Sequence, residues 1–104
     1  MSSHVLQSPV GLLQHAGAQI VLIVSGGGSQ VIPKLLAEGG AGGIMLEALV
    51  PYARSAMRDL LGSEPGTYCS DQTVRQMAVA GWQRSVKLSN EVTNNVGVAA
   101  TASL

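Results

Sequence analysis

The stretch that most constrains the fold runs from Ala18 to Ser29 and joins an apolar run to three consecutive glycines. Residues 20–24 are all β-branched or aliphatic, which is typical of a buried strand. Glycine after such a strand permits positive φ and lets a ligand approach main-chain N–H groups. The next apolar residues recur at helical spacing, at positions 31, 32, 35 and 36. Strand, tight turn and helix are the unit of α/β domains, and a helix N-terminus at this turn favours an anion. We therefore expect a small-molecule site here.

The rest of the chain alternates between strand-like and helical patterns. Short apolar runs and helical periods predict strands at about 19–24, 44–50 and 96–101, and helices at about 30–37, 53–61 and 71–88. Four glycines among residues 38–43 predict a loop, and Gly62 is a plausible C-cap. A short helix within residues 5–15 is the weakest assignment, because Pro9 and Gly11 interrupt it. Interleaved strands and helices predict an α/β fold, with a three-layer α/β/α sandwich.

The helix at 71–88 carries the clearest amphipathic pattern. Either Ser70 or Asp71 can cap its start, and its predicted buried stripe is Val74, Met77, Ala78, Gly81, Trp82, Ser85 and Leu88. Met77 and Trp82 are expected in the core or an interface. Arg75, Gln76, Gln83, Arg84 and Lys87 are expected to face away from that stripe. The single cysteine, Cys69, precedes this helix, and we interpret it as a buried, inert thiol.

Length and composition limit the classes of protein to which this chain can belong. Its 104 residues allow one domain, and six basic and six acidic side chains give no net charge. No basic patch is available for a nucleic-acid backbone, so we expect no nucleic-acid partner. The longest apolar run is too short to span a bilayer, and no secretory signal is evident. A single cysteine excludes an internal disulfide and favours a cytoplasmic location, and we expect no metal and no cofactor.

Four motifs, in order, resemble the CinA C-terminal domain family. They are Val24 to Ser29 (VSGGGS), Leu46 to Tyr52 (LEALVPY), Tyr68 to Ser70 (YCS) and Gly97 to Leu104 (GVAATASL). The resemblance implies a three-layer α/β/α fold, association into oligomers or with a partner domain, and hydrolysis of the amide of nicotinamide mononucleotide. It covers residues 18–104 as one domain, after an N-terminal segment or short helix at 1–17. The chain stops in the loop after its third strand, so we expect a domain truncated at the C-terminus.

The family's catalytic pattern carries over only in part. The serine of its Ser-Cys-Thr-Gly-Gly motif, the nucleophile, falls on Ile23, and the following threonine falls on Ser25. The lysine of its Tyr-Ser-Asn-Glu-Ala-Lys motif falls on Met57, although the tyrosine is present as Tyr52. A serine nucleophile needs an adjacent base, so the catalytic residues of this chain are unknown. In principle Ser25 or Ser29 can replace the lost nucleophile, with Lys34 as the base, but no motif supports either pair.

The resemblance still implies a ligand-binding set around the glycine turn, consisting of Ser25, Gly26, Gly27, Gly28, Ser29, Tyr52, Thr101 and Ser103. Three functions follow as hypotheses. The first is a degenerate module that binds a nicotinamide-type nucleotide or related small molecule without efficient catalysis. The second is a nicotinamide mononucleotide amidohydrolase with a rearranged site. The third is an assembly domain with a vestigial pocket. A purely structural interpretation is that the glycines form a tight turn that binds no ligand. Tyr52 can equally be a packing residue.

Overall fold

The computed structural model describes residues 15, 17–26, 30–37, 41–67, 69–89 and 94–102. In chain order its elements are β1 (Ala18–Gly26), α3 (Val31–Ala37), α4 (Ala41–Ile44), β2 (Met45–Leu49), α5 (Arg54–Leu61), α6 (Asp71–Leu88) and β3 (Asn94–Ala102). The predicted α/β class is confirmed, since helices separate the strands of a parallel sheet. The prediction of a short helix within residues 5–15 lies almost wholly outside the described residues.

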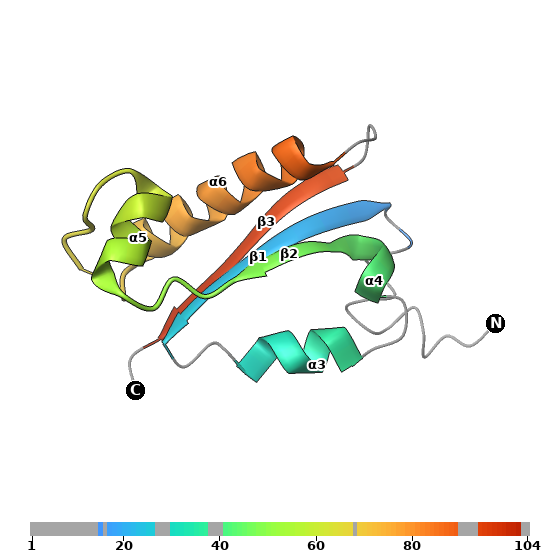
Figure 1. Ribbon diagram of the computed structural model, residues 1–104, viewed down its shortest axis with the longest axis horizontal. Coiled ribbons are helices and arrows are strands. Elements are labelled where there is room, and N and C mark those ends of the chain that lie inside the picture. The colour runs from blue at the N-terminus through green and yellow to red at the C-terminus, as the bar shows by residue number, and fades with distance from the viewer. Residues whose placement is uncertain are drawn as a thin grey trace.

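The sheet has three parallel strands in the order β2-β1-β3, so the first strand lies in the centre (Figure 1). All three strands were predicted, and β1 and β3 extend further at both ends than their apolar runs. The chain leaves β1 for β2 through α3 and α4, and then returns through α5 and α6 to reach β3 on the other side of β1. This reversal at β1 is the arrangement that places ligand sites in open α/β sheets.

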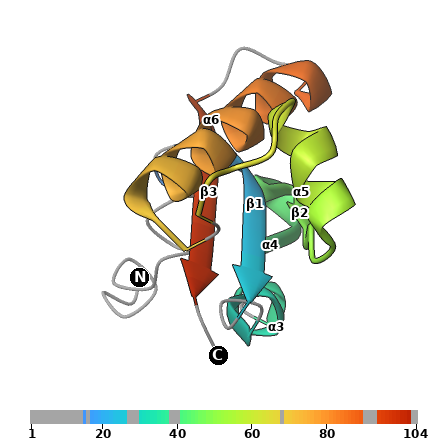
Figure 2. The same cartoon turned by 90° about the vertical axis from the view of Figure 1, so that its left-hand side faces the viewer.

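Helices lie on both sides of the sheet. Figures 1 and 2 show α6 and α5 on one side and α3 on the other. Helix α6 packs against all three strands, with most of its packing on β3 and β1. The helix predicted at 71–88 is confirmed with those bounds, and so is the αL cap at Gly62, where φ is 79°. The broad side of α6 therefore covers one face of the sheet.

One predicted loop is helical in part. Residues 41–44 form the single turn α4, whereas residues 38–40 lie outside the described residues. Glycine disfavours long helices through its backbone entropy, but one turn incurs little of that cost. Ile44, at the end of the turn, is only 4% exposed. Burial of this side chain accounts for a helical turn that composition argued against.

The core is aliphatic and is centred on β1. Residues 20–24 are all at most 1% exposed, so β1 is buried on both faces as its sequence predicted. Alternate residues of β1 face α6, where Val21 and Ile23 form a buried cluster with Met57 of α5 and Met77 of α6. The prediction of Met77 as a core residue is confirmed. Two helices are thus fixed to the central strand through sulfur-containing side chains, which fill irregular gaps well.

Helix α6 approaches the sheet so closely that Gly97 of β3 has no room for a Cβ and Gly81 of α6 has little. The Cα of Gly97 in β3 lies 3.3 Å from the position that a Cβ on Gly81 of α6 would occupy. A Cβ on Gly97 would overlap the backbone of Ala78 and Trp82, and would lie 2.9 Å from the Gly81 carbonyl carbon. Because the obstacle is main chain rather than a flexible side chain, it has no rotamer by which to move away. The contact fixes the height of α6 above β3 and β1.

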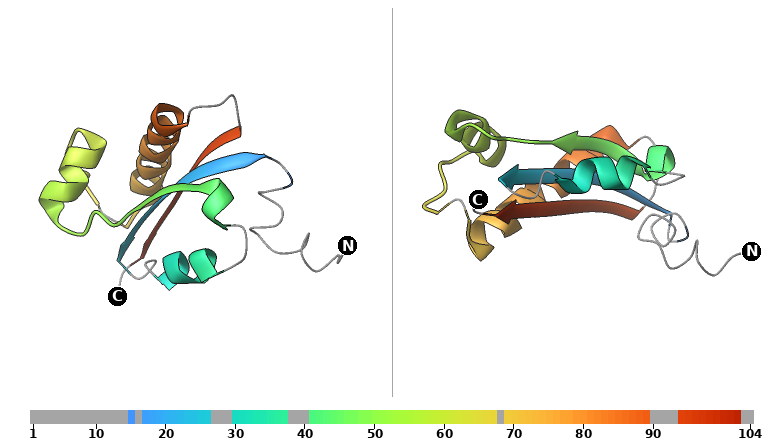
Figure 3. Two further views of the ribbon diagram at one scale, coloured as in Figure 1. Left: turned by 45° about the vertical axis from the view of Figure 1, so that its right-hand side comes forward. Right: turned by 90° about the horizontal axis from the view of Figure 1, so that it is seen from below.

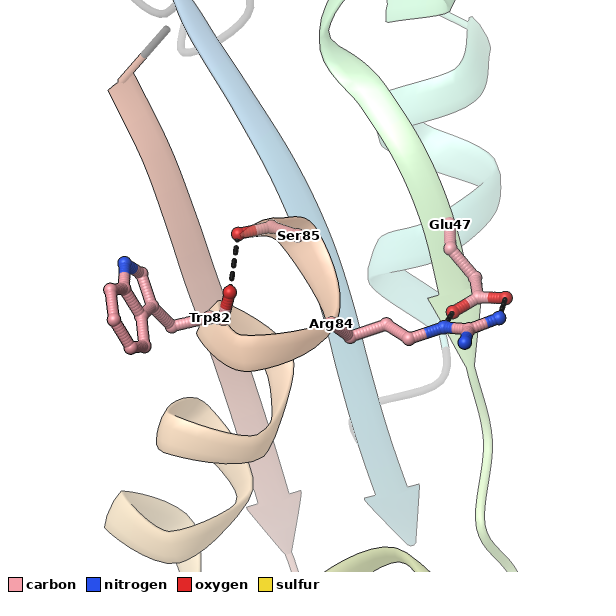
Figure 4. A network of polar contacts seen from close by, with 4 residues as sticks. All are labelled: Glu47, Trp82, Arg84 and Ser85. Atoms are coloured by element: carbon pink, nitrogen blue, oxygen red, sulfur yellow. Dashed lines mark hydrogen bonds and ion pairs between the residues drawn. The ribbon is translucent and has the colours of Figure 1, made fainter. Parts of the chain in front are cut away.

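The buried stripe of α6 differs from its prediction at the edges. Thr73, Met77, Gly81 and Ser85 are buried, whereas Trp82 is 49% exposed. Trp82 is therefore not a core residue of this chain: it projects beside β3, the edge strand, where no further strand of the described sheet covers it (Figure 4). Two polar members of the stripe have partners, since the Ser85 hydroxyl donates to the Trp82 carbonyl at 2.6 Å and Thr73 donates to the Thr67 carbonyl. Their burial therefore leaves no unsatisfied donor.

An ion pair joins α6 to the opposite edge of the sheet. Arg84 Nε lies 2.7 Å from Glu47 Oε1, and Arg84 Nη2 lies 3.1 Å from Glu47 Oε2, which makes the pair bidentate (Figure 4). A register irregularity in the β1–β2 pairing sets Glu47 opposite Val21, on the face covered by α6. The prediction that Arg84 faces away from the sheet is wrong for this reason. A further polar link at the same, C-terminal end of the helix runs from the Ser89 hydroxyl to Gln19 Oε1 at 2.8 Å.

We predict that Gly97→Ala destabilises the fold by about 3 kcal/mol or more, because the added methyl group meets backbone atoms of α6. The matched control is Gly66→Ala, where a Cβ meets no atom within 4 Å and φ is not positive. That change should shift stability by about 1 kcal/mol or less. Urea unfolding followed by circular dichroism measures both. Equal stability of the two variants would show that the close approach does not exist.

A second prediction concerns pH. The hydrogen bond from Arg84 lowers the pKa of Glu47 below its usual value of 4.5, against the opposing effect of partial burial. Because the pKa is lower in the folded chain, the pair's stabilisation is present above pH 4.5 and is lost as pH falls through the lower folded value. Glu47→Gln should therefore lower the melting temperature slightly at pH 7, and not at pH 2.5. Asp59→Asn, on the exposed side of α5, is the control. A Glu47→Gln deficit that persists at low pH would mean that packing, not charge, is responsible.

Candidate functional site

The carboxyl ends of β1 and β3 lie side by side, and polar residues gather there. Ser25 pairs with Thr101 and Gly26 pairs with Ala102 in the parallel ladder. In a parallel pair, partners present their side chains to the same face, so the two hydroxyl-bearing residues share the α6 side. Figures 2 and 3 show the two arrowheads adjacent. Two residues of the predicted ligand-binding set, 76 positions apart in sequence, are thus neighbours at the point where the sheet reverses its winding.

The backbone at the end of β1 has the conformation that its glycine was expected to allow. Gly26 has φ of 68°, in the left-handed region, where a side chain is strained. This positive φ ends the strand and directs the chain away from the sheet. Gly27, Gly28, Ser29 and Ser103 of the predicted set lie outside the described residues.

Cys69 joins this cluster, which sequence reasoning did not anticipate. Its Sγ lies 3.7 Å from Thr101 Oγ1, and the residue is exposed. The interpretation of Cys69 as a buried thiol is therefore wrong. It lies one residue before the N-cap of α6, at the N-terminal end of that helix rather than in the core.

The cap of α6 holds Cys69 in place. The Ser70 hydroxyl oxygen accepts a hydrogen bond from the Thr73 backbone N–H at 3.1 Å, which confirms Ser70 as the N-cap. The same hydroxyl donates to the Thr67 carbonyl at 3.2 Å. Together with the Thr73 hydroxyl, these bonds tie the incoming chain to the first turn of the helix. The position of the thiol beside Thr101 therefore depends on α6 and not on the loop alone.

Tyr52 stands apart from the hydroxyl cluster. It follows buried Pro51 after the end of β2, and it is 80% exposed. Strand β2 ends opposite Ile23, two positions before Ser25 in β1. The tyrosine is therefore on the carboxyl edge of the sheet, but its side chain extends into solvent. Lys34 is also exposed, on α3 at the other side of the sheet.

The two positions that the family resemblance assigns to a nucleophile and a base belong to the same buried cluster. Ile23 is fully buried and Met57 is 1% exposed, and both belong to the core cluster beneath α6. The cluster is apolar, and neither of these two side chains accepts or donates a proton. At these positions the chain has buried apolar side chains, whereas the family motif has a serine nucleophile and a lysine base.

The larger hollows of the surface lie elsewhere. A hollow of about 510 Å³ adjoins the Glu47–Arg84 ion pair, and a groove of about 430 Å³ runs between α5 and α6. A polar hollow of about 380 Å³ adjoins Ser63 to Thr67 and the start of α6. Within the described ranges, no group of three or more histidine, cysteine, aspartate or glutamate side chains is placed to hold a metal ion. No described helix is both long and apolar enough to cross a bilayer.

Comparisons with protein-family models, with curated proteins and with solved structures found no match for this chain. The carboxyl ends of β1 and β3 are where the polar residues of the predicted set lie together. We call the cluster of Ser25, Gly26, Cys69 and Thr101 the edge site. It offers two hydroxyls, a thiol and the main-chain groups of Gly26.

Proposed function

We propose that this chain is a degenerate CinA-like domain that binds a nicotinamide-type nucleotide or a related small molecule at the edge site, without efficient catalysis. The observation that carries the proposal is the pairing of Ser25 with Thr101 beside Cys69, at the winding reversal of a parallel sheet. Ligands of open α/β sheets bind in that position, because the loops there diverge to opposite faces and leave a crevice. Hydroxyl and main-chain N–H groups at such a turn suit the phosphate and ribose of a nucleotide.

The absence of efficient catalysis follows from the residues at the positions of the family's nucleophile and base. Ile23 and Met57 are buried in the same cluster, so no serine–lysine pair exists there. Groups that act as a catalytic unit are strongly non-additive, and loss of both leaves only binding and backbone donors. The alternative, an amidohydrolase with a rearranged site, requires another nucleophile, and Ser25 is the hydroxyl closest in sequence to the lost one. Ammonia release is the property that separates the two.

The finer architecture belongs to the same proposal. Helix α6 on one side of the sheet and α3 on the other support a three-layer α/β/α sandwich of the CinA type. The order β2-β1-β3 supports it as well, because right-handed crossovers that run in opposite directions along the sheet place their helices on opposite faces.

We expect nicotinamide mononucleotide to raise the melting temperature and to change the amide NMR signals of Ser25, Gly26 and Thr101, because a ligand that prefers the native state stabilises it. It should also slow the reaction of Cys69 with a thiol reagent. Thr101→Val and Ser25→Ala should each weaken binding about three- to tenfold, as loss of one hydrogen bond does. Ser55→Ala, on exposed α5, is the matched control.

Ammonia release from nicotinamide mononucleotide should stay at the level of buffer alone. Release that Ser25→Ala abolishes would replace the binding proposal with the amidohydrolase. Absence of any shift in melting temperature and in the three amide signals would remove nicotinamide mononucleotide as the ligand.

A further part of the proposal is that a second copy of the chain covers the edge of β3 with which no strand of the described sheet pairs. This nine-residue strand carries no charged side chain, and its Val98 is 38% exposed. Trp82 of α6, beside the strand, is 49% exposed. Uncharged, unprotected edge strands pair readily with another strand, and two copies of one edge complement each other through main-chain hydrogen bonds. Assembly is therefore the second function that a specific observation favours.

Light scattering across a concentration series tests this association. We expect a mass above that of one chain for the wild type and for Val50→Lys, an exposed site remote from β3. Val98→Lys should give a single-chain mass, because a lysine on an edge strand opposes pairing. A wild type that stays monomeric at high concentration would rule out the second copy.

A further inference from the structure

A groove that the edge site does not use lies between α5 and α6, on the outer side of the molecule. The two helices pack against each other, and the groove has a volume of about 430 Å³. This falls within the range of about 300–1,000 Å³ that small-molecule sites occupy. Its position follows from the fold, because α6 is held to the sheet by Gly81 and the shorter α5 by Met57.

The floor of the groove is apolar and partly open to solvent. Leu60 and Leu61 of α5 face Val79 and Ala80 of α6. Val79 is 54% exposed, so the structure leaves a large aliphatic side chain uncovered at this place. An apolar ligand segment laid over it would remove that surface from water.

The rim of the groove is polar and carries one positive charge. It contains Arg75 and the three side-chain amides of Gln72, Gln76 and Gln83. Within the described part of the chain, none of these four side chains has a hydrogen bond or ion pair. Among the residues that the structure describes, no carboxylate lines this groove; Asp59 and Glu64 line the hollows on either side of it. The rim thus presents an available guanidinium and amide donors beside an apolar floor.

This combination points to a single class of ligand. We propose that the α5–α6 groove binds small monocarboxylates with an aliphatic body, with the carboxylate on Arg75 and the chain over Leu61 and Val79. Guanidinium matches carboxylate in shape and charge, and the amides can donate further hydrogen bonds to the same oxygens. The wall formed by α5 is eight residues, or about 12 Å, long. That length suits a short acyl chain better than a peptide helix of three or more turns.

The test uses octanoate and its neutral counterpart octanamide, both titrated below the concentration at which octanoate forms micelles, with the full chain followed by amide NMR. We expect saturable shifts confined to α5 and α6, and tighter binding of octanoate than of octanamide. Arg75→Gln should weaken octanoate about two- to fivefold, as loss of a solvent-exposed ion pair does, and leave octanamide unchanged. Val79→Gln should weaken both.

Arg58→Gln is the matched control, since Arg58 is exposed on α5 outside the groove lining. It removes the same charge and should change neither affinity. Shifts that do not saturate, or octanoate binding that Arg75→Gln leaves intact, would overturn the proposal. The outcome is independent of the edge site, because nicotinamide mononucleotide and octanoate would perturb different amides.

Discussion

The close approach of α6 to the sheet at Gly81 and Gly97 is the constraint on which the other features depend. Two backbones meet there with no side chain between them, and Ile23 packs at the same point. Once α6 is fixed at this height, its first turn comes to the carboxyl end of β3, and Cys69 comes beside Thr101. Further along the same helix, Arg84 reaches Glu47 on β2 and Ser89 reaches Gln19 at the start of β1. One contact therefore sets the register of the polar links at both ends.

The hydrophobic core and the edge site are adjacent along β1. The positions that carry chemistry in the family it resembles are here the centre of the hydrophobic cluster, where Ile23 and Met57 meet Val21 and Met77. Polar groups remain only one step further along the strands, at Ser25 and Thr101. Such an arrangement places apolar packing beneath α6 and hydroxyl groups at the carboxyl edge of the sheet. It is the physical basis for proposing a module that holds a ligand.

The sequence predicted local elements well, because each carries its own signal. The apolar run of β1, the amphipathic period of α6 and the αL glycine after α5 all act within a few residues, and all are confirmed. Errors arose where a distant residue decides. Ile44 is buried by the fold and forms a helical turn despite the glycines before it, and Trp82 is exposed because β3 is an edge strand. Arg84 turns toward the sheet because a strand irregularity presents Glu47 to it.

For the candidate site, the division between sequence and structure is the same. The sequence by itself determined that a strand ends in glycine, that hydroxyls follow two strands and that Ser70 caps a long helix, since these depend on neighbours along the chain. Only the tertiary structure decided that Ser25 and Thr101 are partners, that Cys69 joins them, and that Gly97 lies against Gly81. Those facts depend on strand order and on the height of α6, and both are set by packing between residues far apart in sequence, which no local pattern encodes.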